Sequence, residues 1–173
     1  SLYPLLTLHM PRMRTPFYRM NVSEEDAIKY GTEFFQSLGL DTPIAFETIH
    51  DPGRNSSHAA LGYAPGHFTD IIAERDYGIC IDTGHSKMAT VPLSEFLKLP
   101  YEISSIHLNG NDGTGDQHLL PTKNNVGDYT AVVEAIRRCT GPVVFEVRKV
   151  DELTGKEYTK EQVRECVEFW RNI

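Results

Sequence analysis

Ile79-Cys80-Ile81-Asp82-Thr83-Gly84-His85 is the stretch that decides the fold. A short apolar run ends in the carboxylate of Asp82, and the imidazole of His85 follows closely. Because the run has no alternating polar residues, it predicts a strand buried on both faces. A turn at Gly84 would bring Asp82 and His85 into one small volume. Carboxylate and imidazole groups bind divalent metals, although an aspartate at a strand end more often caps a helix or forms an ion pair.

The same arrangement recurs along the chain. Further strands are predicted at Leu5–Leu8, Ile44–Phe46, Ile103–Ile106 and Val143–Phe145, each a short apolar run. A polar residue able to do chemistry follows each of them, giving, with Asp82, the set His9, Glu47, Asp82, His107 and Glu146. The carboxyl ends of the strands of a parallel barrel open onto one face, so these side chains are expected to converge there.

Helices are predicted between the strands. Ser23, Asp128 and Thr159 are placed to cap three of them, and Thr159 forms a capping box with Gln162. Two shorter helices are expected around residues 68–72 and after Pro92. The last helix is expected to bury four side chains, Val163, Cys166, Val167 and Trp170. Five strands alternating with helices indicate a parallel sheet covered by helices, which is the α/β class.

One long loop, Asn109–Gly127, follows the strand that ends at His107. A loop of this length inside a compact domain is more often functional than idle. Asp116 and His118 flank a single residue in it, so both could reach one metal ion or one substrate hydroxyl. The alternative is a hydrated surface loop with no such role.

Composition sets limits on the function. The 173 residues have the length of one domain, and 40% hydrophobic with 24% charged residues is ordinary for a globular protein. The net charge of −7 argues against nucleic-acid binding, which usually needs a basic face. No GxGxxG follows a strand and no glycine-rich phosphate loop is present, so a nucleotide site lacks its usual signals.

Localisation is predicted to be cytoplasmic. The three cysteines, Cys80, Cys139 and Cys166, are odd in number and show no CxxC spacing, so they read as reduced, mostly buried thiols. Pro4 interrupts the apolar residues near the amino terminus, and no basic region precedes them, so a signal peptide is not expected. No segment is long enough to predict a membrane span.

Taken together, these motifs resemble the xylose isomerase-like TIM-barrel superfamily, which contains sugar isomerases and epimerases and the related apurinic-site endonucleases. The resemblance covers essentially the whole chain. It is carried by Leu8-His9, Phe46-Glu47-Thr48, Ile81-Asp82-Thr83-Gly84-His85, Ile106-His107-Leu108, Gly115-Asp116-Gln117-His118 and Phe145-Glu146-Val147. It implies a (β/α) barrel of which about five of eight units, the carboxy-terminal part, lie in the single domain formed by residues 1–173.

The resemblance also implies a site. Glu47, Asp82, His107 and Glu146 match the residues that hold one divalent metal ion in the family. Relatives with a larger metal cluster also use residues that match His9, His85, Asp116 and His118. A site of three carboxylates and one imidazole suits Mn²⁺, Mg²⁺ or Co²⁺ and tolerates Zn²⁺.

The implied reaction is isomerisation or epimerisation of a sugar or sugar phosphate, by proton transfer next to a carbonyl through a metal-stabilised enediolate. Glu47 and Glu146 are the candidates for the two proton carriers, and His85 would contact a substrate oxygen or orient a ligand. A small carbohydrate is therefore the expected substrate. Four basic residues could bind a phosphate or could simply be surface charges: Lys87, Lys123, Arg148 and Lys149.

Two alternatives stay open. A metal-dependent phosphodiesterase of the apurinic-endonuclease type would use the full ligand set, but the acidic charge balance opposes binding to a phosphate backbone. A truncated relative that keeps the site without turning over substrate is the second alternative.

The sequence departs from the family pattern in two places. Residues Leu119–Asn125 lack the glycine-rich turn that many relatives carry there. Five strands also stand where the family barrel has eight, which leaves strand edges that need cover. We therefore expect the chain to form a homo-oligomer or to associate with a missing amino-terminal segment.

Overall fold

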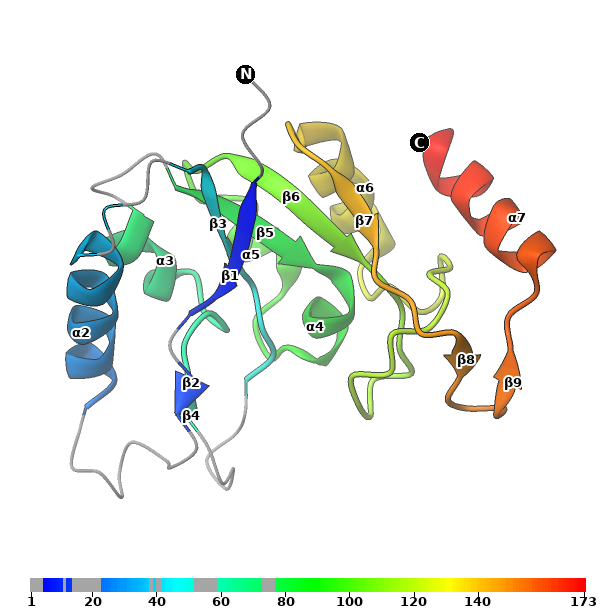
Figure 1. Cartoon of the computed structure of the whole chain (residues 1–173), viewed down its shortest axis with the longest axis horizontal. Helices are drawn as coiled ribbons and strands as arrows, with labels where there is room; N and C mark the ends of the chain where they lie inside the picture. Colours follow the sequence, from blue (N-terminus) through cyan, green and yellow to red (C-terminus); the bar gives the residue numbers. More distant parts are fainter. Residues whose placement is uncertain are drawn as a thin grey trace.

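The computed structural model describes residues 5–10, 12–13, 23–37, 39, 42–51, 59–72 and 77–173. Its centre is a five-stranded sheet in the order β1-β3-β5-β6-β7, and every neighbouring pair is parallel (Figure 1). The strands are β1 (Leu6–His9), β3 (Ile44–Glu47), β5 (Gly78–Asp82), β6 (Ile103–Leu108) and β7 (Val143–Phe145). All five lie where the sequence predicts them, within a residue or two at their ends.

The register of the sheet aligns the strand ends. His9 of β1 pairs with Glu47 of β3, and Asp82 of β5 pairs with His107 of β6. Glu146 directly follows β7, whose last residue, Phe145, pairs with Leu108. The polar residues that end the strands therefore share one edge of the sheet.

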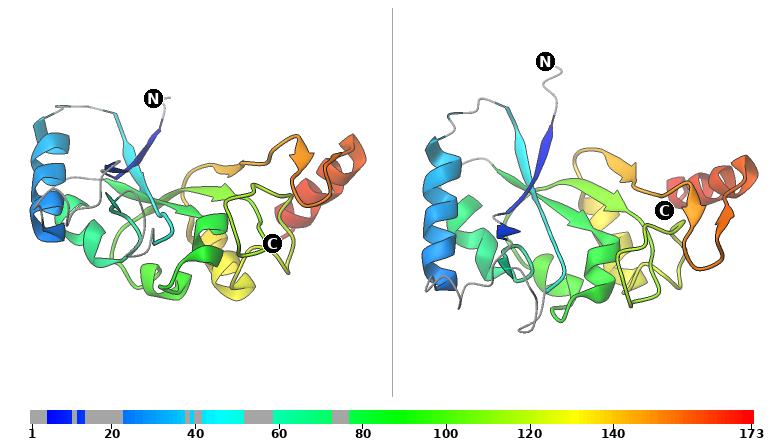
Figure 2. Two further views of the ribbon diagram at one scale, coloured as in Figure 1. Left: turned by 90° about the horizontal axis from the view of Figure 1, so that it is seen from below. Right: turned by 60° about the horizontal axis from the view of Figure 1, so that its bottom comes forward.

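Helices cover one face of this sheet, as the two views of Figure 2 show. They are α2 (Glu24–Ser37), α3 (Gly66–Ile72), α5 (Leu93–Phe96) and α6 (Tyr129–Arg138). Phe46 of β3 points into this layer, with its ring 4.6 Å from that of Phe35 and 5.5 Å from that of Tyr77. Burial of these rings and of the aliphatic residues around them supplies the core.

The predicted helix caps are present. Asp128 accepts hydrogen bonds from the backbone amides of Thr130 and Ala131, and Thr159 and Gln162 form the capping box. One helix was not predicted, because the sequence suggested only a turn at its position. This helix, α4 (Thr83–Met88), begins directly after β5 and takes Asp82 as its N-cap residue.

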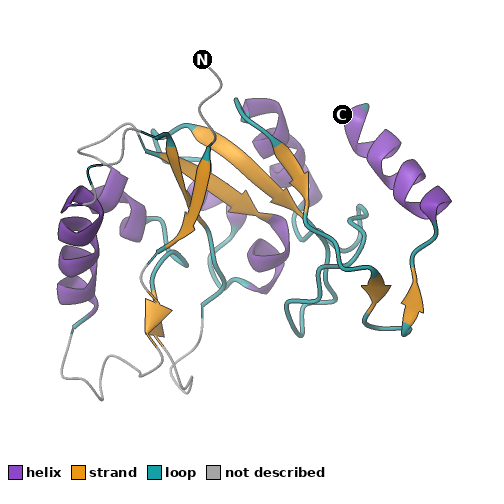
Figure 3. Ribbon diagram, viewed as in Figure 1, coloured by secondary structure: helices purple, strands orange, loops and turns teal. Residues whose placement is uncertain are grey.

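The last helix, α7 (Lys160–Arg171), stands apart from the sheet (Figure 3). It packs on the segment after His118, where the Trp170 indole donates to the carbonyl oxygen of Pro121 at 2.9 Å. Trp170 is buried as predicted, but Val163 is 41% exposed, so the prediction for this side chain was wrong. Val163 lacks cover because α7 contacts a loop rather than the broad face of a sheet.

Short antiparallel pairs complete the fold. The hairpin of β8 (Val150–Asp151) and β9 (Lys156–Glu157) precedes α7, and β2 (Arg12–Met13) pairs with β4 (Ala59–Ala60). Within the described residues, no helix has the length and apolar character needed to cross a bilayer.

Candidate metal centre

The imidazole of His107 lies between two carboxylates at the carboxyl edge of the sheet. Its Nδ1 is 3.3 Å from Oε2 of Glu47 and 3.0 Å from Oε2 of Glu146. This nitrogen is buried, yet neither contact has the geometry of a hydrogen bond. Burial lowers the pKa of His107, but the neighbouring Cys80 and Glu47 side chains outweigh this effect and raise the pKa to about 11. The surroundings of this ring thus strongly favour a positive charge.

Asp82 supplies a third carboxylate and is completely buried. Its Oδ1 accepts from the backbone amide of His85 at 2.7 Å, which is the cap of α4, and its Oδ2 accepts from the amide group of Asn109 at 3.0 Å. Burial raises the pKa of Asp82, against the opposing effect of His85. The helix-cap reading of Asp82 is therefore correct, and the residue also reaches the other carboxylates.

Potential ligand atoms of Asp82, His107 and Glu146 all lie within 4.8 Å of one another, as do those of Glu47, Asp82 and His85. The four side chains that the sequence proposes as ligands of one ion thus lie in two overlapping groups of three that share Asp82. That they bind metal stays a prediction.

His85 projects from α4 toward the same region. Its Nδ1 is 2.9 Å from the carbonyl oxygen of Thr48 and its Nε2 is 3.6 Å from Oδ2 of Asp116. Because a carbonyl oxygen can only accept, Nδ1 must carry a proton, so Nε2 is the ring nitrogen that could bind a metal ion once it loses its own proton. Burial lowers the pKa of His85, but Asp116, Glu47 and Asp82 together raise it to about 11.

Asp116 and His118 lie beside this histidine. His118 Nε2 is 3.2 Å from Oδ2 of Asp116, and its Nδ1 donates to the carbonyl oxygen of Glu146 at 2.9 Å. The nearby His85 ring lowers the pKa of Asp116 to about 2. His118 has a φ of 50°, an uncommon backbone conformation for a residue other than glycine, and such strain concentrates at functional sites.

The loop that carries Asp116 and His118 is held at both ends. The backbones of Gly110 and Leu119 exchange two hydrogen bonds, of 2.9 and 2.8 Å. Asn109 and Asn111, at the start of the loop, are completely buried, and Asn111 donates to the carbonyl oxygen of Gly84 at 2.6 Å. The loop is thus ordered and lies against the cluster at the sheet edge. That Asp116 and His118 bind a metal ion or a substrate stays a prediction.

His9 ends β1 in register with Glu47, but its side chain lies outside the described part of the structure. The four basic residues considered for phosphate binding all have other partners. Lys87 donates to backbone oxygens of Asn111 and Asn124, and Lys123 lies over the rings of Tyr129 and Phe169. Arg148 pairs with Glu152, and Lys149 pairs with Glu157.

The donor set fits a divalent cation. Ligand atoms bound to one ion at about 2.1 Å lie about 3.0–3.4 Å apart, and the contacts of His107 Nδ1 with Glu47 and Glu146 fall in that range. An unpartnered ring nitrogen beside carboxylate oxygens needs either a proton or a metal ion between them. Carboxylates with imidazole favour Mn²⁺, Co²⁺ or Zn²⁺.

Sequence reasoning missed two residues of this site. Cys80 is completely buried and shares a possible ligand group with Glu47 and His107. Asn109 orients Asp82. A signal for both was present, because side chains two residues apart on a strand share a face, and each lies two residues from a predicted ligand.

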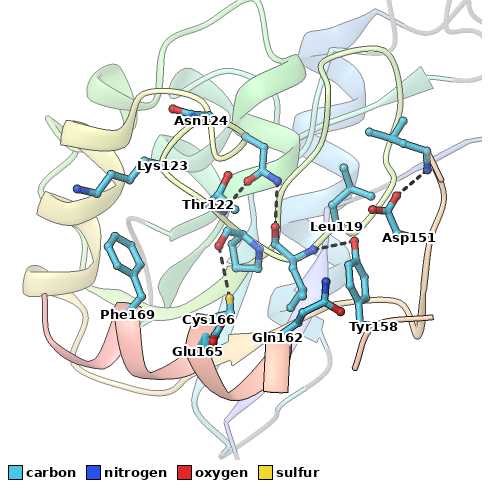
Figure 4. A pocket seen from close by; sticks show the side chains of 14 residues that line it. Leu119, Thr122, Lys123, Asn124, Asp151, Tyr158, Gln162, Glu165, Cys166 and Phe169 are labelled. Carbon is cyan, nitrogen blue, oxygen red and sulfur yellow. Dashed lines mark hydrogen bonds between the residues drawn. The ribbon is translucent and has the colours of Figure 1, made fainter. Parts of the chain in front are cut away.

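A separate cavity of about 700 Å³ lies between α7 and residues 119–125 (Figure 4). Leu119, Leu120, Pro121 and Phe169 give it an apolar lining, and it includes none of the ligand candidates. Two of its polar side chains bond to the backbone of Leu120: the Tyr158 hydroxyl accepts from the Leu120 amide, and Asn125 donates to the Leu120 carbonyl.

No protein-family model and no curated protein matches this sequence. Solved structures do match. The chain resembles a D-tagatose 3-epimerase-like protein with a TM-score of 0.67 at 19% identity, over 97% of this chain and 63% of that one. It resembles endonuclease IV from Thermus thermophilus with a TM-score of 0.52 at 14% identity, over 97% and 60%. It resembles the 3-keto-D-glucoside 4-epimerase from E. coli with a TM-score of 0.53 at 15% identity, over 87% of this chain and 56% of that one.

The chain thus spans less than two thirds of the length of each of these structures. At such identities the likeness establishes the fold. The prediction of a partial TIM barrel of five parallel strands is confirmed.

Proposed function

We propose that this chain, which has the fold of the xylose isomerase-like TIM-barrel superfamily, is the metal-binding part of a carbohydrate isomerase or epimerase. The reaction would be proton transfer at a carbon next to a sugar carbonyl. Two of the structures that it resembles are described as an epimerase-like protein and an epimerase.

The observation that carries the proposal is the pair of glutamates around His107. Both carboxylates approach the same ring nitrogen, from separate strands, at 3.3 and 3.0 Å. Their exposure differs: the side chain of Glu47 is 5% exposed and that of Glu146 is 45% exposed. One proton carrier would therefore be shielded from water, and the other would be open to solvent and substrate.

Glu47, Asp82, His107 and Glu146 would hold the ion. When bound, a divalent ion would supply a Lewis acid that makes the C–H next to a substrate carbonyl more acidic. One glutamate would take the proton from carbon and the other would return a proton, which would give epimerisation at one carbon or isomerisation between two. His85, fixed by its hydrogen bond to the Thr48 carbonyl, would contact a substrate oxygen through Nε2.

The surroundings support a small substrate of low charge. Lys87, Lys123, Arg148 and Lys149 are each engaged with protein groups. A polyanion such as a nucleic-acid backbone needs several such cations, whereas a sugar is bound by hydrogen bonds.

The test is proton exchange in heavy water. The chain, loaded with Mn²⁺ or Co²⁺, is incubated with a panel of ketoses and aldoses, and NMR follows the deuterium that enters the carbon beside the carbonyl. The Glu146→Gln variant should lose about 10²–10⁴-fold in the rate of exchange, which is the range for a general acid or base.

Glu168→Gln makes the same chemical change on an exposed position of α7 and should leave the rate unaltered. If Glu146→Gln exchanged deuterium as fast as the unchanged chain, Glu146 would have no part in the reaction. If no sugar in the panel exchanged with any metal, the isomerase proposal would fail.

A second candidate, a metal-dependent phosphodiesterase, is favoured by the contacts of Asp116. His85 and His118 both direct Nε2 toward its Oδ2, at 3.6 and 3.2 Å, and both fix Nδ1 on a backbone carbonyl. Such an arrangement suits additional Zn²⁺ ions. Cleavage of a duplex containing one abasic site by the Zn²⁺-loaded chain, abolished by Asp116→Asn, would establish this candidate in place of the first.

A further inference from the structure

Cys80 lies on the same face of β5 as Asp82, one layer deeper in the sheet. Alternation along a strand places residues two apart on one side, and both side chains are completely buried. The Cys80 side chain is a neighbour of the His107 ring. Potential ligand atoms of Cys80, Glu47 and His107 all lie within 4.8 Å of one another.

We infer that Cys80, Glu47 and His107 form a second metal position, selective for thiophilic divalent cations such as Zn²⁺ and Cd²⁺. One sulfur, one imidazole nitrogen and one carboxylate oxygen are a typical donor set for Zn²⁺ with an open fourth position. Thiolate ligands select soft ions, whereas Mn²⁺ and Mg²⁺ prefer the carboxylates of Asp82 and Glu146. The inference shares two residues with the proposed isomerase site but does not depend on any sugar chemistry.

Nδ1 of His107 is buried without a hydrogen bond, which is costly for a polar atom unless a proton or an ion satisfies it. On binding, the Cys80 thiol releases its proton to solvent as the sulfur–metal bond forms, and His107 binds as the neutral ring.

The other two cysteines serve as internal controls. The Cys139 thiol donates to the carbonyl oxygen of Gly141 and that of Cys166 to the carbonyl oxygen of Pro121. Burial raises the pKa of both thiols. Within the described residues, neither belongs to a group of potential metal ligands.

The shared ligands have a consequence. Glu47 and His107 are ligands in both proposed positions. They therefore cannot bind one ion beside Cys80 and a second ion beside Asp82 and Glu146 without a loss of affinity at one of the two. Zn²⁺ or Cd²⁺ should therefore displace Mn²⁺ from the chain, and removal of the sulfur should reduce this advantage.

The experiment uses the full chain, freed of metal with a chelator and kept reduced. Cd²⁺ and Co²⁺ are added while the ultraviolet absorption of the thiolate-to-metal charge transfer is recorded. The unchanged chain and the double variant Cys139→Ser/Cys166→Ser should both show one such band per chain. Cys80→Ala and Cys80→Ser should show none and should bind Cd²⁺ at least about 10–100-fold more weakly. Mn²⁺ binding, measured by calorimetry, should remain in both.

The double variant makes the test decisive even if the Cys80 variants fail to fold, because Cys80 is then the only thiol. A band absent from that variant, or retained in Cys80→Ala, overturns the inference. If the chain binds Mn²⁺ but shows no charge-transfer band, the inference about Cys80 fails and the proposed metal site stands. If it binds neither Mn²⁺ nor Cd²⁺, both fail.

Discussion

The side-chain hydroxyls of Thr7 and Ser105 lie 3.5 Å apart, although β3 and β5 separate their strands in the sheet. The sheet is therefore strongly curved, and β1 crosses over its inner face toward β6 (Figure 1). At the opposite end from the site, the Leu5 side chain lies 3.9 Å from the position that a Cβ of Gly141 would occupy, just before β7. This curvature directs the residues at the strand ends toward one another.

The outer strands should promote association. Within the described sheet β1 and β7 are each paired on one side only, and they expose Leu6 (39%) and Val144 (44%). Unpaired apolar edges favour pairing with another chain. Sedimentation should therefore show self-association, and Leu6→Lys should weaken it. Phe34→Lys, at an exposed apolar residue of α2 away from an edge, is the control and should have less effect. A monomer at all concentrations would contradict this proposal.

The Asp82→Asn substitution separates capping from metal binding. Asparagine caps helices about as well as aspartate, and burial already disfavours the charged carboxylate. Without metal, the free energy of unfolding of the variant should therefore lie within about 1 kcal/mol of that of the unchanged chain, or exceed it. Its affinity for Mn²⁺ should fall at least about 10–100-fold. Denaturant melts with and without Mn²⁺ measure both effects. A metal-free loss above about 2 kcal/mol would mean that the charge itself holds the fold.

The metal-free chain should become less stable as the pH rises above neutrality. The pKa values of His85 and His107 are raised from 6.5 to about 11, so their contribution to stability is complete below pH 6.5 and is lost as the pH approaches 11. The buried Asp82, whose pKa is raised from 3.8, contributes fully below pH 3.8 and loses this contribution as the pH rises through its pKa in the fold. Asp116, whose pKa is lowered from 3.8 to about 2, contributes above pH 3.8, and its contribution is lost as the pH falls toward 2.

Metal binding should show the opposite dependence on pH. The histidines bind metal as neutral rings, so Mn²⁺ affinity should rise about tenfold per pH unit for each proton displaced. Melts of the metal-free chain between pH 5 and pH 9 and calorimetric Mn²⁺ titrations over the same range check the two trends. Metal-free stability that increased toward pH 9 would show that the rings are neutral in the fold.

Gly84 should resist substitution although it lies in a helix. A Cβ there would meet Oδ1 of the buried Asn109 at 1.9 Å, and Asn109 holds Asp82. Gly84→Ala should therefore destabilise the chain by about 1–3 kcal/mol and weaken Mn²⁺ binding, despite the better helix propensity of alanine. Gly115→Ala, where nothing lies within 4 Å, should be neutral or stabilising by about 0.4–1 kcal/mol. Equal melting points for the two variants would refute the role given to Asn109.

Much of the sheet edge could be predicted from the sequence. Glu47, Asp82, His107 and Glu146 each end a short apolar run, and it was the recurrence of this pattern in four successive strands that pointed to a shared edge. The helix caps at Asp128 and Thr159 could also be predicted from the sequence, because each depends only on residues within one helical turn.

Features that depend on contacts between distant parts of the chain could not be predicted from the sequence. The exposure of Val163 follows from where α7 docks, which its own periodicity does not determine. The short hairpin of β8 and β9 has no apolar alternation, so propensity gave no signal for it. The approach of Cys80 to His107 required the register between β5 and β6, which includes an irregularity between Ile79 and Cys80.

The pair of hydrogen bonds between Gly110 and Leu119 closes the loop that carries Asp116 and His118 into a ring with its own internal order. At its tip, Asp112 accepts from the backbone and hydroxyl of Thr114, so the tip is organised locally and does not rely on the sheet. Replacements between residues 112 and 115 should therefore leave the closure of the ring in place, and with it the positions of Asp116 and His118. Under the proposed function, this tip is the segment of the loop to vary first in a search for altered substrate range.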